Sequence, residues 1–305
     1  MNTLTIENLS KSFNKNLVID NLSFNVQEHS VFGFIGANGA GKTTVMKMVL
    51  GLLKPDNGSI TVCNEKVSFG QTKTNKFIGY LPDVPEFYGY MRPLEYLKLC
   101  GDITGLSADL IKSKSDELLQ LVGLDGVNKK ISGFSRGMKQ RLGIAQALLH
   151  EPKLLLCDEP TSALDPIGRK EILDILFRIK GKTTVVFSTH ILSDVERICD
   201  CLAVIDKGRL IIHGTKQQLK SHHKADSLFI EFKSIEDINI FISDAVISEF
   251  LNIAEQDKET VTFHYTDIDH LHLKVIEALS RLKILPSKLE LSEPSIESLF
   301  MEVVK

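Results

Sequence analysis

The sequence lacks several features that would place it in common functional classes. Lys and Arg (36) do not outnumber Asp and Glu (39), and the net charge of -3 leaves no basic excess. Proteins that bind nucleic acid usually carry a strongly basic domain or stripe, so the composition argues against nucleic acid as a partner. No run of 18 or more apolar residues is present, and the polar, alternating residues 1–11 are not typical of a signal peptide. We therefore expect a cytoplasmic protein without a membrane span of its own.

Cysteine is scarce as well. The five cysteines are odd in number and scattered, which indicates free thiols in a reducing compartment. Cys199 and Cys201 flank Asp200, and a metal site is one interpretation of this pair. A C-x-C pair without further ligands is more often structural.

The chain is long enough for a large domain and a smaller companion, with 305 residues, of which 43% are hydrophobic and 25% charged. Alternating apolar and polar residues at 3–9 and 17–26 predict an antiparallel strand pair. From residue 153 the pattern becomes strand, helix, strand, helix, which is typical of a parallel sheet. The polar, basic stretch 216–224 shows no core pattern, so we expect one domain at 1–220 and a second at 227–305.

The second domain has its own pattern of elements. Its apolar periodicity predicts a β-α-β-β-α-β order, and thus a small α+β domain of the ferredoxin-like kind. The expected elements are at 228–232, 235–247, 250–254, 260–265, 268–282 and 284–291, followed by a last helix at 294–304.

The most informative segment is residues 35–44, I-G-A-N-G-A-G-K-T-T, which follows an apolar run at 31–35. The run predicts a buried strand that leads into a phosphate-binding loop. In such a loop, backbone N–H groups surround a polyphosphate, Lys42 supplies a positive charge, and the Thr43 hydroxyl can bind Mg²⁺. A chance match is the alternative, but the preceding strand and the helical pattern that follows argue against it. The segment predicts a nucleoside triphosphate site.

A second motif, residues 153–159, reads K-L-L-L-C-D-E. Its leucines predict a buried strand that delivers Asp158 and Glu159 to its carboxyl end, where open α/β sheets bind ligands. Asp158 can hold Mg²⁺, and Glu159 can polarise an attacking water as a general base. An ordinary solvated acidic pair at a strand end is the alternative interpretation.

A third motif, residues 133–142, reads G-F-S-R-G-M-K-Q-R-L and predicts a short turn that opens an apolar helix. Such a turn can present N–H groups and the Ser135 hydroxyl to a phosphate. On its own, an S-x-G turn indicates no more than a capped helix.

These motifs occur in the order phosphate loop, serine-glycine signature and acidic strand end, followed by S-A-L-D at 162–165 and S-T-H at 188–190. In this order and spacing the chain resembles the ATP-binding cassette (ABC) ATPases over residues 1 to about 220. The resemblance implies an α/β P-loop NTPase domain with a RecA-like core, an antiparallel β-subdomain and an α-helical subdomain. It also implies ATP and Mg²⁺ as ligands.

The resemblance further implies roles for the matching residues. Lys42 would contact the β- and γ-phosphates, Glu159 would be the catalytic base, and His190 would contact the γ-phosphate. Thr43 and Asp158 would bind Mg²⁺. The residues implied to hold the phosphates are Gly36, Asn38, Gly39, Ala40, Gly41, Lys42, Thr43 and Thr44.

Other matching residues lie outside the phosphate loop. Phe13 is at the position where the family places an adenine-stacking aromatic, and a core phenylalanine at a strand end is the alternative. The resemblance implies that Ser135 and Gly137 close on ATP held by a second cassette, and that Asp165 communicates across the dimer. A homodimer and a heterodimer are both compatible with the sequence.

Two positions depart from the family pattern. The usual leucine, first glycine and glutamine of the signature are replaced by Phe134, Arg136 and Met138. Arg136 therefore places a charge near the expected interface. Asp83 stands where the family usually has glutamine; it could ligate Mg²⁺ or order water, but it adds negative charge beside the γ-phosphate.

The subgroup is indicated by G-Y-L-P-D at 79–83, by S-x-G-M-K-Q-R-L at the signature, and by E-P-S-I-E-S-L-F near the end of the chain. Together they resemble bacterial exporters of the bacitracin and bacteriocin self-protection kind. The resemblance implies separate transmembrane permease subunits, which would contact this chain at 83–91. It also implies a peripheral location on the inner face of the membrane. The alternatives to an exporter are an importer ATPase, a soluble non-transport ABC ATPase and a pseudo-ATPase. The sequence does not identify the transported compound or the role of 227–305.

Overall fold

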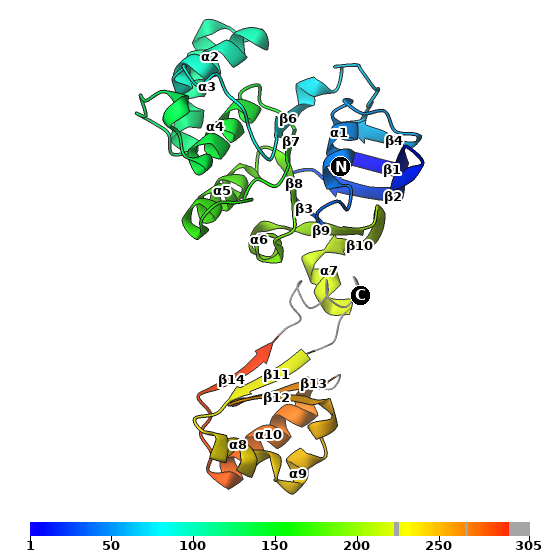
Figure 1. Ribbon diagram of the computed structural model, residues 1–305, viewed down its shortest axis with the longest axis vertical. Coiled ribbons are helices and arrows are strands. Elements are labelled where there is room, and N and C mark those ends of the chain that lie inside the picture. The colour runs from blue at the N-terminus through cyan, green and yellow to red at the C-terminus, as the bar shows by residue number, and fades with distance from the viewer. Residues whose placement is uncertain (223–225, 266–267, 293–305) are drawn as a thin grey trace. The chain divides into compact units, whose positions relative to one another are not determined.

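The computed structural model describes residues 1–222, 226–265 and 268–292. The chain divides into two units, Met1–Lys216 and Gln217–Lys305 (Figure 1). Among the described residues, no helix is both long and apolar enough to cross a membrane.

A six-stranded sheet organises the larger unit, with the strand order β10-β9-β3-β8-β7-β6. Its strands are β3 (Val31–Ile35), β6 (Ile78–Leu81), β7 (Leu154–Cys157), β8 (Thr184–Thr189), β9 (Cys201–Asp206) and β10 (Arg209–Thr215). All pairs are parallel except β9 with β10. Every residue of β3, β7 and β8 is buried, which explains their continuous apolar runs, because a parallel sheet is covered on both faces. The parallel pairing brings the carboxyl ends of β3, β6, β7 and β8 to one edge.

A second, antiparallel sheet is ordered β2-β1-β4-β5. Its strands are β1 (Asn2–Phe13), β2 (Asn16–Gln27), β4 (Asn57–Val62) and β5 (Glu65–Lys66). Helix α1 (Lys42–Val49) and strand β3 share one core with this sheet. Phe24 of β2 stacks on Phe32 of β3 with ring centroids 5.4 Å apart. This shared core fixes the antiparallel sheet beside the strand that leads into the phosphate loop.

Besides α1, the larger unit contains α2 (Pro93–Ile103), α3 (Ala108–Leu121), α4 (Arg136–Leu148), α5 (Pro166–Ile179) and α6 (Leu192–Ile198). The side chains of Ser107, Ser135 and Asp165 accept N–H groups from the first turns of α3, α4 and α5. Figure 1 shows α2, α3 and α4 grouped on the opposite side of the six-stranded sheet from β1, β2 and β4. The unit is thus an α/β core with an antiparallel β-subdomain and an α-helical subdomain, as predicted.

The smaller unit contains a four-stranded antiparallel sheet ordered β12-β13-β11-β14. Its elements are β11 (Asp226–Glu231), α8 (Ile235–Ile242), α9 (Ala245–Ser248), β12 (Ala254–Asp257), β13 (Thr260–Tyr265), α10 (Ile268–Leu282) and β14 (Lys288–Ser292). A separate apolar core lies between the sheet and its helices. This strand order and the β-α-β-β-α-β sequence make the unit ferredoxin-like.

Some boundaries differ from the sequence prediction. The helix expected at 235–247 is two helices, because the Asp244 carboxylate caps a new one by accepting from Val246 N and Ile247 N. The strand expected at 250–254 begins only at Ala254, after a 3-10 turn. The strand expected at 284–291 is β14, Lys288–Ser292.

The prediction was also incomplete near the boundary between the two units. The stretch at 216–224 was expected to be a domain boundary without a core pattern, and no helix was predicted in it; Lys216–His222 forms helix α7. The helix expected at 294–304 lies outside the described residues.

Candidate functional site

A cavity of about 270 Å³ lies at the carboxyl edge of the parallel sheet. Strands β3, β6 and β7 each lead into it, which is where open α/β sheets bind ligands. Its lining residues are Val18, Asn38, Gly39, Gly41, Lys42, Thr43, Thr44, Asp83, Asp158 and Glu159. Residues predicted from two separate motifs, the phosphate loop and the acidic strand end, therefore meet at one place.

The phosphate loop requires glycine at two of its positions. Gly41, just before α1, has a φ of 107°, and a Cβ there would lie 2.4 Å from Ile19 Cδ1. A Cβ on Gly36 would lie 2.7 Å from the carbonyl oxygen of Ile205. The loop can therefore turn tightly over the end of β3 and lead into the N-terminus of α1, where N–H groups and the helix dipole favour an anion.

Lys42 is buried, with 6% of its surface exposed. Its Nζ donates to the carbonyl oxygen of Gly36 at 2.6 Å and lies 3.1 Å from Glu159 Oε1. A buried ammonium needs such partners, because burial without them is strongly unfavourable. The lysine is thus held at the cavity by groups that a phosphate oxygen can replace.

Asp158 is buried, and each oxygen of its carboxylate accepts from a hydroxyl. Thr43 Oγ1 donates to Oδ2 at 2.6 Å, and Ser188 Oγ donates to Oδ1 at 2.6 Å. A carboxylate and a hydroxyl side by side form an oxygen donor set of the kind that Mg²⁺ prefers when it also binds a phosphate. Thr43 and Asp158 therefore fit the ion predicted for them.

Glu159 lies between two positively polarised groups. Its Oε2 is 2.9 Å from His190 Nδ1, and its Oε1 faces Lys42. The residue has a φ of 47°, a left-handed conformation that is uncommon outside glycine and costs about 1–3 kcal/mol. The structure thus joins the three residues predicted to be catalytic in one chain of contacts, Lys42–Glu159–His190.

Ser188 is a site residue to which sequence reasoning gave no role. Its hydroxyl donates to Asp158 and accepts from the backbone N–H of Glu159 at 2.9 Å. It therefore fixes the two acids relative to strand β8. Its place in the S-T-H segment, two residues before His190, was the available signal.

A buried network behind the acids was also missed. The Asp194 carboxylate, only 2% exposed, accepts from Thr161 Oγ1 at 2.7 Å and from Arg169 Nη2 at 2.6 Å. The network ties the segment after Glu159 to helix α6, which follows His190. Since Asp194 lies 33 and 25 positions from Thr161 and Arg169, no local pattern indicated the network.

Seven predicted residues are not part of the cavity lining. Gly36 and Ala40 belong to the phosphate loop and His190 contacts Glu159, whereas the other four belong to separate segments. Phe13 is 43% exposed, with Lys11 Nζ 5.4 Å from its ring centroid, so it is not a core residue. Ser135 and Asp165 cap α4 and α5 by accepting from Met138 N and Gly168 N. Gly137 follows Ser135 in the first turn of α4. Their predicted roles toward ATP held by another cassette stay predictions.

Asp83 lines the cavity together with the other two acids, and its Oδ1 accepts from Arg136 Nη2 at 3.0 Å. Burial raises the pKa of Asp83; the Arg136 guanidinium opposes this shift, and the Asp158 and Glu159 carboxylates add to it. A metal ion would compete with the guanidinium for this carboxylate, so a role of Asp83 as an Mg²⁺ ligand also stays a prediction.

The C-x-C pair has no features of a metal site. Cys199 and Cys201 are free thiols, and burial raises the pKa of both. The Asp200 carboxylate between them accepts from Val31 N and Lys180 Nζ. Within the described ranges, no group of three or more His, Cys, Asp or Glu side chains could hold a metal ion.

Comparisons with known proteins agree with this geometry. Residues 19–162 match the family model described as "ABC transporter". An uncharacterized ABC transporter ATP-binding protein of Bacillus subtilis (strain 168) is 37% identical over 99% of both chains. The bacitracin transport ATP-binding protein of Bacillus licheniformis is 35% identical over 97% of this chain and 95% of its own.

Two further similarities bear on function and fold. The linearmycin resistance ATP-binding protein of Bacillus subtilis (strain 168) is 32% identical over 98% of this chain and 97% of its own. Among solved structures, cbiO1 from Clostridium perfringens, part of the ABC transporter complex cbiONQ, has a TM-score of 0.67 at 27% identity. That match covers 72% of this chain and 91% of the other.

Proposed function

The chain belongs to the family of ABC transporter ATP-binding proteins, and on this premise we propose that it hydrolyses ATP to drive a bacterial exporter of antimicrobial peptides, drugs or similar amphiphiles. The observation that carries hydrolysis is the contact of Glu159 with both Lys42 and His190 beside the nucleotide cavity. Export is supported by relatives named for bacitracin transport and linearmycin resistance, which match over nearly the whole chain.

The phosphate loop and Lys42 bind the triphosphate. Loop N–H groups and the N-terminus of α1 face the cavity, and Lys42 exchanges its contact with Glu159 for phosphate oxygens when ATP enters. Thr43 and Asp158 hold Mg²⁺, which neutralises phosphate charge when bound. The exchange leaves the Glu159 carboxylate available for a water molecule.

Glu159 then acts as the general base. Its Oε1 accepts the proton of the water whose oxygen attacks the γ-phosphorus, while His190 holds Oε2 in place. The bond from the γ-phosphorus to the bridging oxygen breaks, and ADP leaves with that oxygen. Ser188 keeps the backbone of Glu159 in its left-handed conformation by accepting its N–H. His190 and Ser188 thus orient the acid before ATP enters and after Lys42 has exchanged its contact, which reduces the reorganisation needed for reaction.

The remaining assembly follows from the family. Two cassettes, identical or different, close so that Ser135 and Gly137 of each contact the ATP held by the other. Closure drives separate transmembrane permease subunits, and the chain therefore lies at the inner face of the membrane. The ferredoxin-like domain at 227–305 is an accessory to the cassette at 1–220.

Loss of the chain from its host tests the direction of transport. We expect a strain without it to become several-fold more sensitive to bacitracin or another amphiphilic antibiotic, measured as the minimal inhibitory concentration. The wild-type chain restores resistance, and the Glu159→Gln variant does not. Unchanged sensitivity across a panel of such compounds, together with reduced uptake of a nutrient, would favour an importer instead.

Phe13→Ala is expected to weaken ATP binding by about tenfold, because base stacking on an aromatic ring contributes roughly 1–3 kcal/mol. The measurement is a titration with a fluorescent ATP analogue. Phe177→Ala is the matched control, since Phe177 is also exposed and has Lys180 Nζ 5.8 Å from its ring centroid. Equal affinities of the two variants would remove Phe13 from the adenine site.

A further inference from the structure

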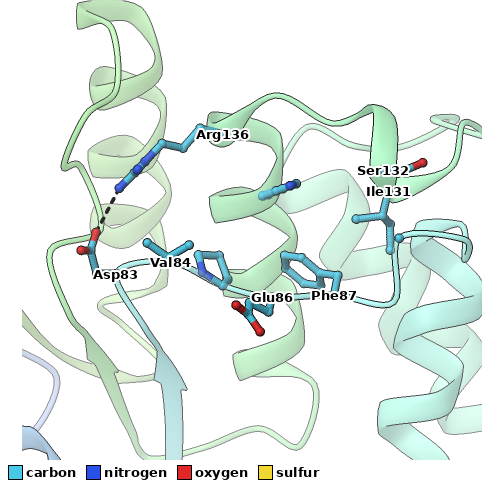
Figure 2. Close-up of a pocket in the computed structure, with 10 residues that line it drawn as sticks. Asp83, Val84, Glu86, Phe87, Ile131, Ser132 and Arg136 are labelled. Atoms are coloured by element: carbon cyan, nitrogen blue, oxygen red, sulfur yellow. Dashed lines mark hydrogen bonds and ion pairs between the residues drawn. The ribbon is translucent and has the colours of Figure 1, made fainter.

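A second cavity, of about 520 Å³, lies next to the nucleotide cavity. Figure 2 shows the segment after β6 along its floor and Arg136, at the start of α4, reaching across to Asp83. Asp83 lines both cavities, so it forms part of the wall between them.

The two departures from the family pattern are therefore partners of each other. Asp83 Oδ1 and Arg136 Nη2 are 3.0 Å apart, although 53 positions separate them in the chain. Gln140, fully buried on the same helix, donates its Nε2 to the carbonyl oxygen of Asp83 at 2.6 Å. Helix α4 thus holds both the backbone and the side chain of Asp83.

The charges around the nucleotide cavity show why this contact matters. Its lining includes three carboxylates, those of Asp83, Asp158 and Glu159, and one ammonium group, that of Lys42. A triphosphate adds further negative charge, and like charges at close range oppose binding by several-fold or more in a partly buried site. Arg136 does not line this cavity, but its guanidinium neutralises the carboxylate of Asp83, which does.

We propose that Arg136 is a positioning residue that neutralises Asp83 and holds it against α4, so that the nucleotide cavity accepts ATP despite its third carboxylate. The inference rests on the proposed function, since it concerns the same ATP site. Its consequence is that the residue at 136 matters for ATP affinity only while an acid stands at 83.

A double-mutant cycle with Arg136→Ala, Asp83→Asn and the double variant tests this directly. We expect R136A to raise the dissociation constant for ATP about fivefold, with a smaller change in kcat, because the pair is about half exposed. In the D83N background, R136A should change the dissociation constant for ATP by less than about twofold relative to D83N alone. R136K, which keeps the charge, should stay near wild type.

Arg197→Ala is the matched control. Arg197 Nη2 lies 2.8 Å from Asp174 Oδ1, with 40% and 43% of the two side chains exposed, against 40% and 47% for Arg136 and Asp83. Its dissociation constant for ATP should equal that of wild type. Thermal unfolding of every variant separates altered binding from a loss of the folded state.

The outcomes separate the two proposals. If R136A weakens ATP binding equally with Asp83 present and in the D83N background, Arg136 acts without Asp83 and the inference is wrong. Unchanged affinity in R136A overturns it as well. With either result, the proposed function stands as long as the wild-type chain binds and hydrolyses ATP. A folded wild-type chain that does not bind ATP overturns the proposed function and this inference together.

Discussion

Glu159→Gln is expected to lower ATP turnover by at least about 100-fold while ATP stays bound, because a general base contributes roughly 10²–10⁴-fold to a rate. An amide has nearly the shape of the carboxylate and can still contact His190 Nδ1, which lies 2.9 Å from Oε2. It cannot accept a proton from water. The variant should therefore lose the chemical step and keep the nucleotide, which phosphate release and ATP titration measure separately.

Glu65→Gln serves as the control for this variant. Glu65 is partly exposed and pairs with Lys73, and neither residue lines the nucleotide cavity. The Glu65→Gln variant should hydrolyse ATP at the wild-type rate. If the Glu159→Gln variant hydrolyses ATP at an undiminished rate, Glu159 is not the general base.

Lys42→Ala is expected to weaken ATP binding by about 10–100-fold and to abolish measurable hydrolysis, because hydrogen bonds to charged groups contribute roughly 1.5–3 kcal/mol. The contacts of its Nζ are the carbonyl oxygens of Gly36 and Ala37 in the phosphate loop and the carboxylate of Glu159, which lines the cavity. The lysine therefore serves the ligand more than the core, and the variant should fold. Circular dichroism checks the fold, and nucleotide titration checks the affinity.

Thermal unfolding sharpens this experiment. A ligand that binds only the folded state stabilises it by RT ln(1 + L/Kd), where L is the free ligand concentration, so at one ligand concentration a tighter ligand raises the unfolding temperature more. Mg²⁺ and ATP should stabilise the wild-type chain and the Lys73→Ala control, whose lysine is exposed on the surface, more than Lys42→Ala. A variant that is unfolded without ligand would contradict a role confined to the ligand, and one with wild-type affinity would contradict the role itself.

The parts of the site that the sequence predicts are those in which adjacent residues carry the information. Gly41 has a φ of 107°, which is a local reason for glycine, and the apolar run before the phosphate loop identifies the strand. Asp158 and Glu159 follow directly on buried β7, so the end of the strand places them. In these cases a short window contains both the element and the chemistry.

The contacts that the sequence did not predict join distant positions. Asp83 and Arg136 were both noticed as departures, but their pairing depends on how α4 packs beside β6. The same holds for Ser188 with Asp158 and for Asp194 with Arg169. Hydrogen bonds between polar side chains leave no periodicity in the sequence. The parallel register of β7 with β8 decides only that Ser188 meets Asp158.

A capping side chain explains why two helices form where one was predicted at 235–247. Apolar periodicity continues through 235–247, so one helix was expected. Asp244 offers its carboxylate to the next N–H groups and starts a new helix there, and Arg281 Nη2 donates to its other oxygen at 2.6 Å. A capping side chain supported by a distant partner outweighs the propensity of the segment.

The most direct test of the central claim is a structure of the Glu159→Gln variant with ATP and Mg²⁺, together with the cassette it pairs with. We predict the γ-phosphate at Lys42 Nζ in the cavity beside Asp158, with Ser135 of the second cassette at the same phosphate. A nucleotide bound outside this cavity, or a signature turn that faces away from the γ-phosphate held by the other cassette, would contradict the account.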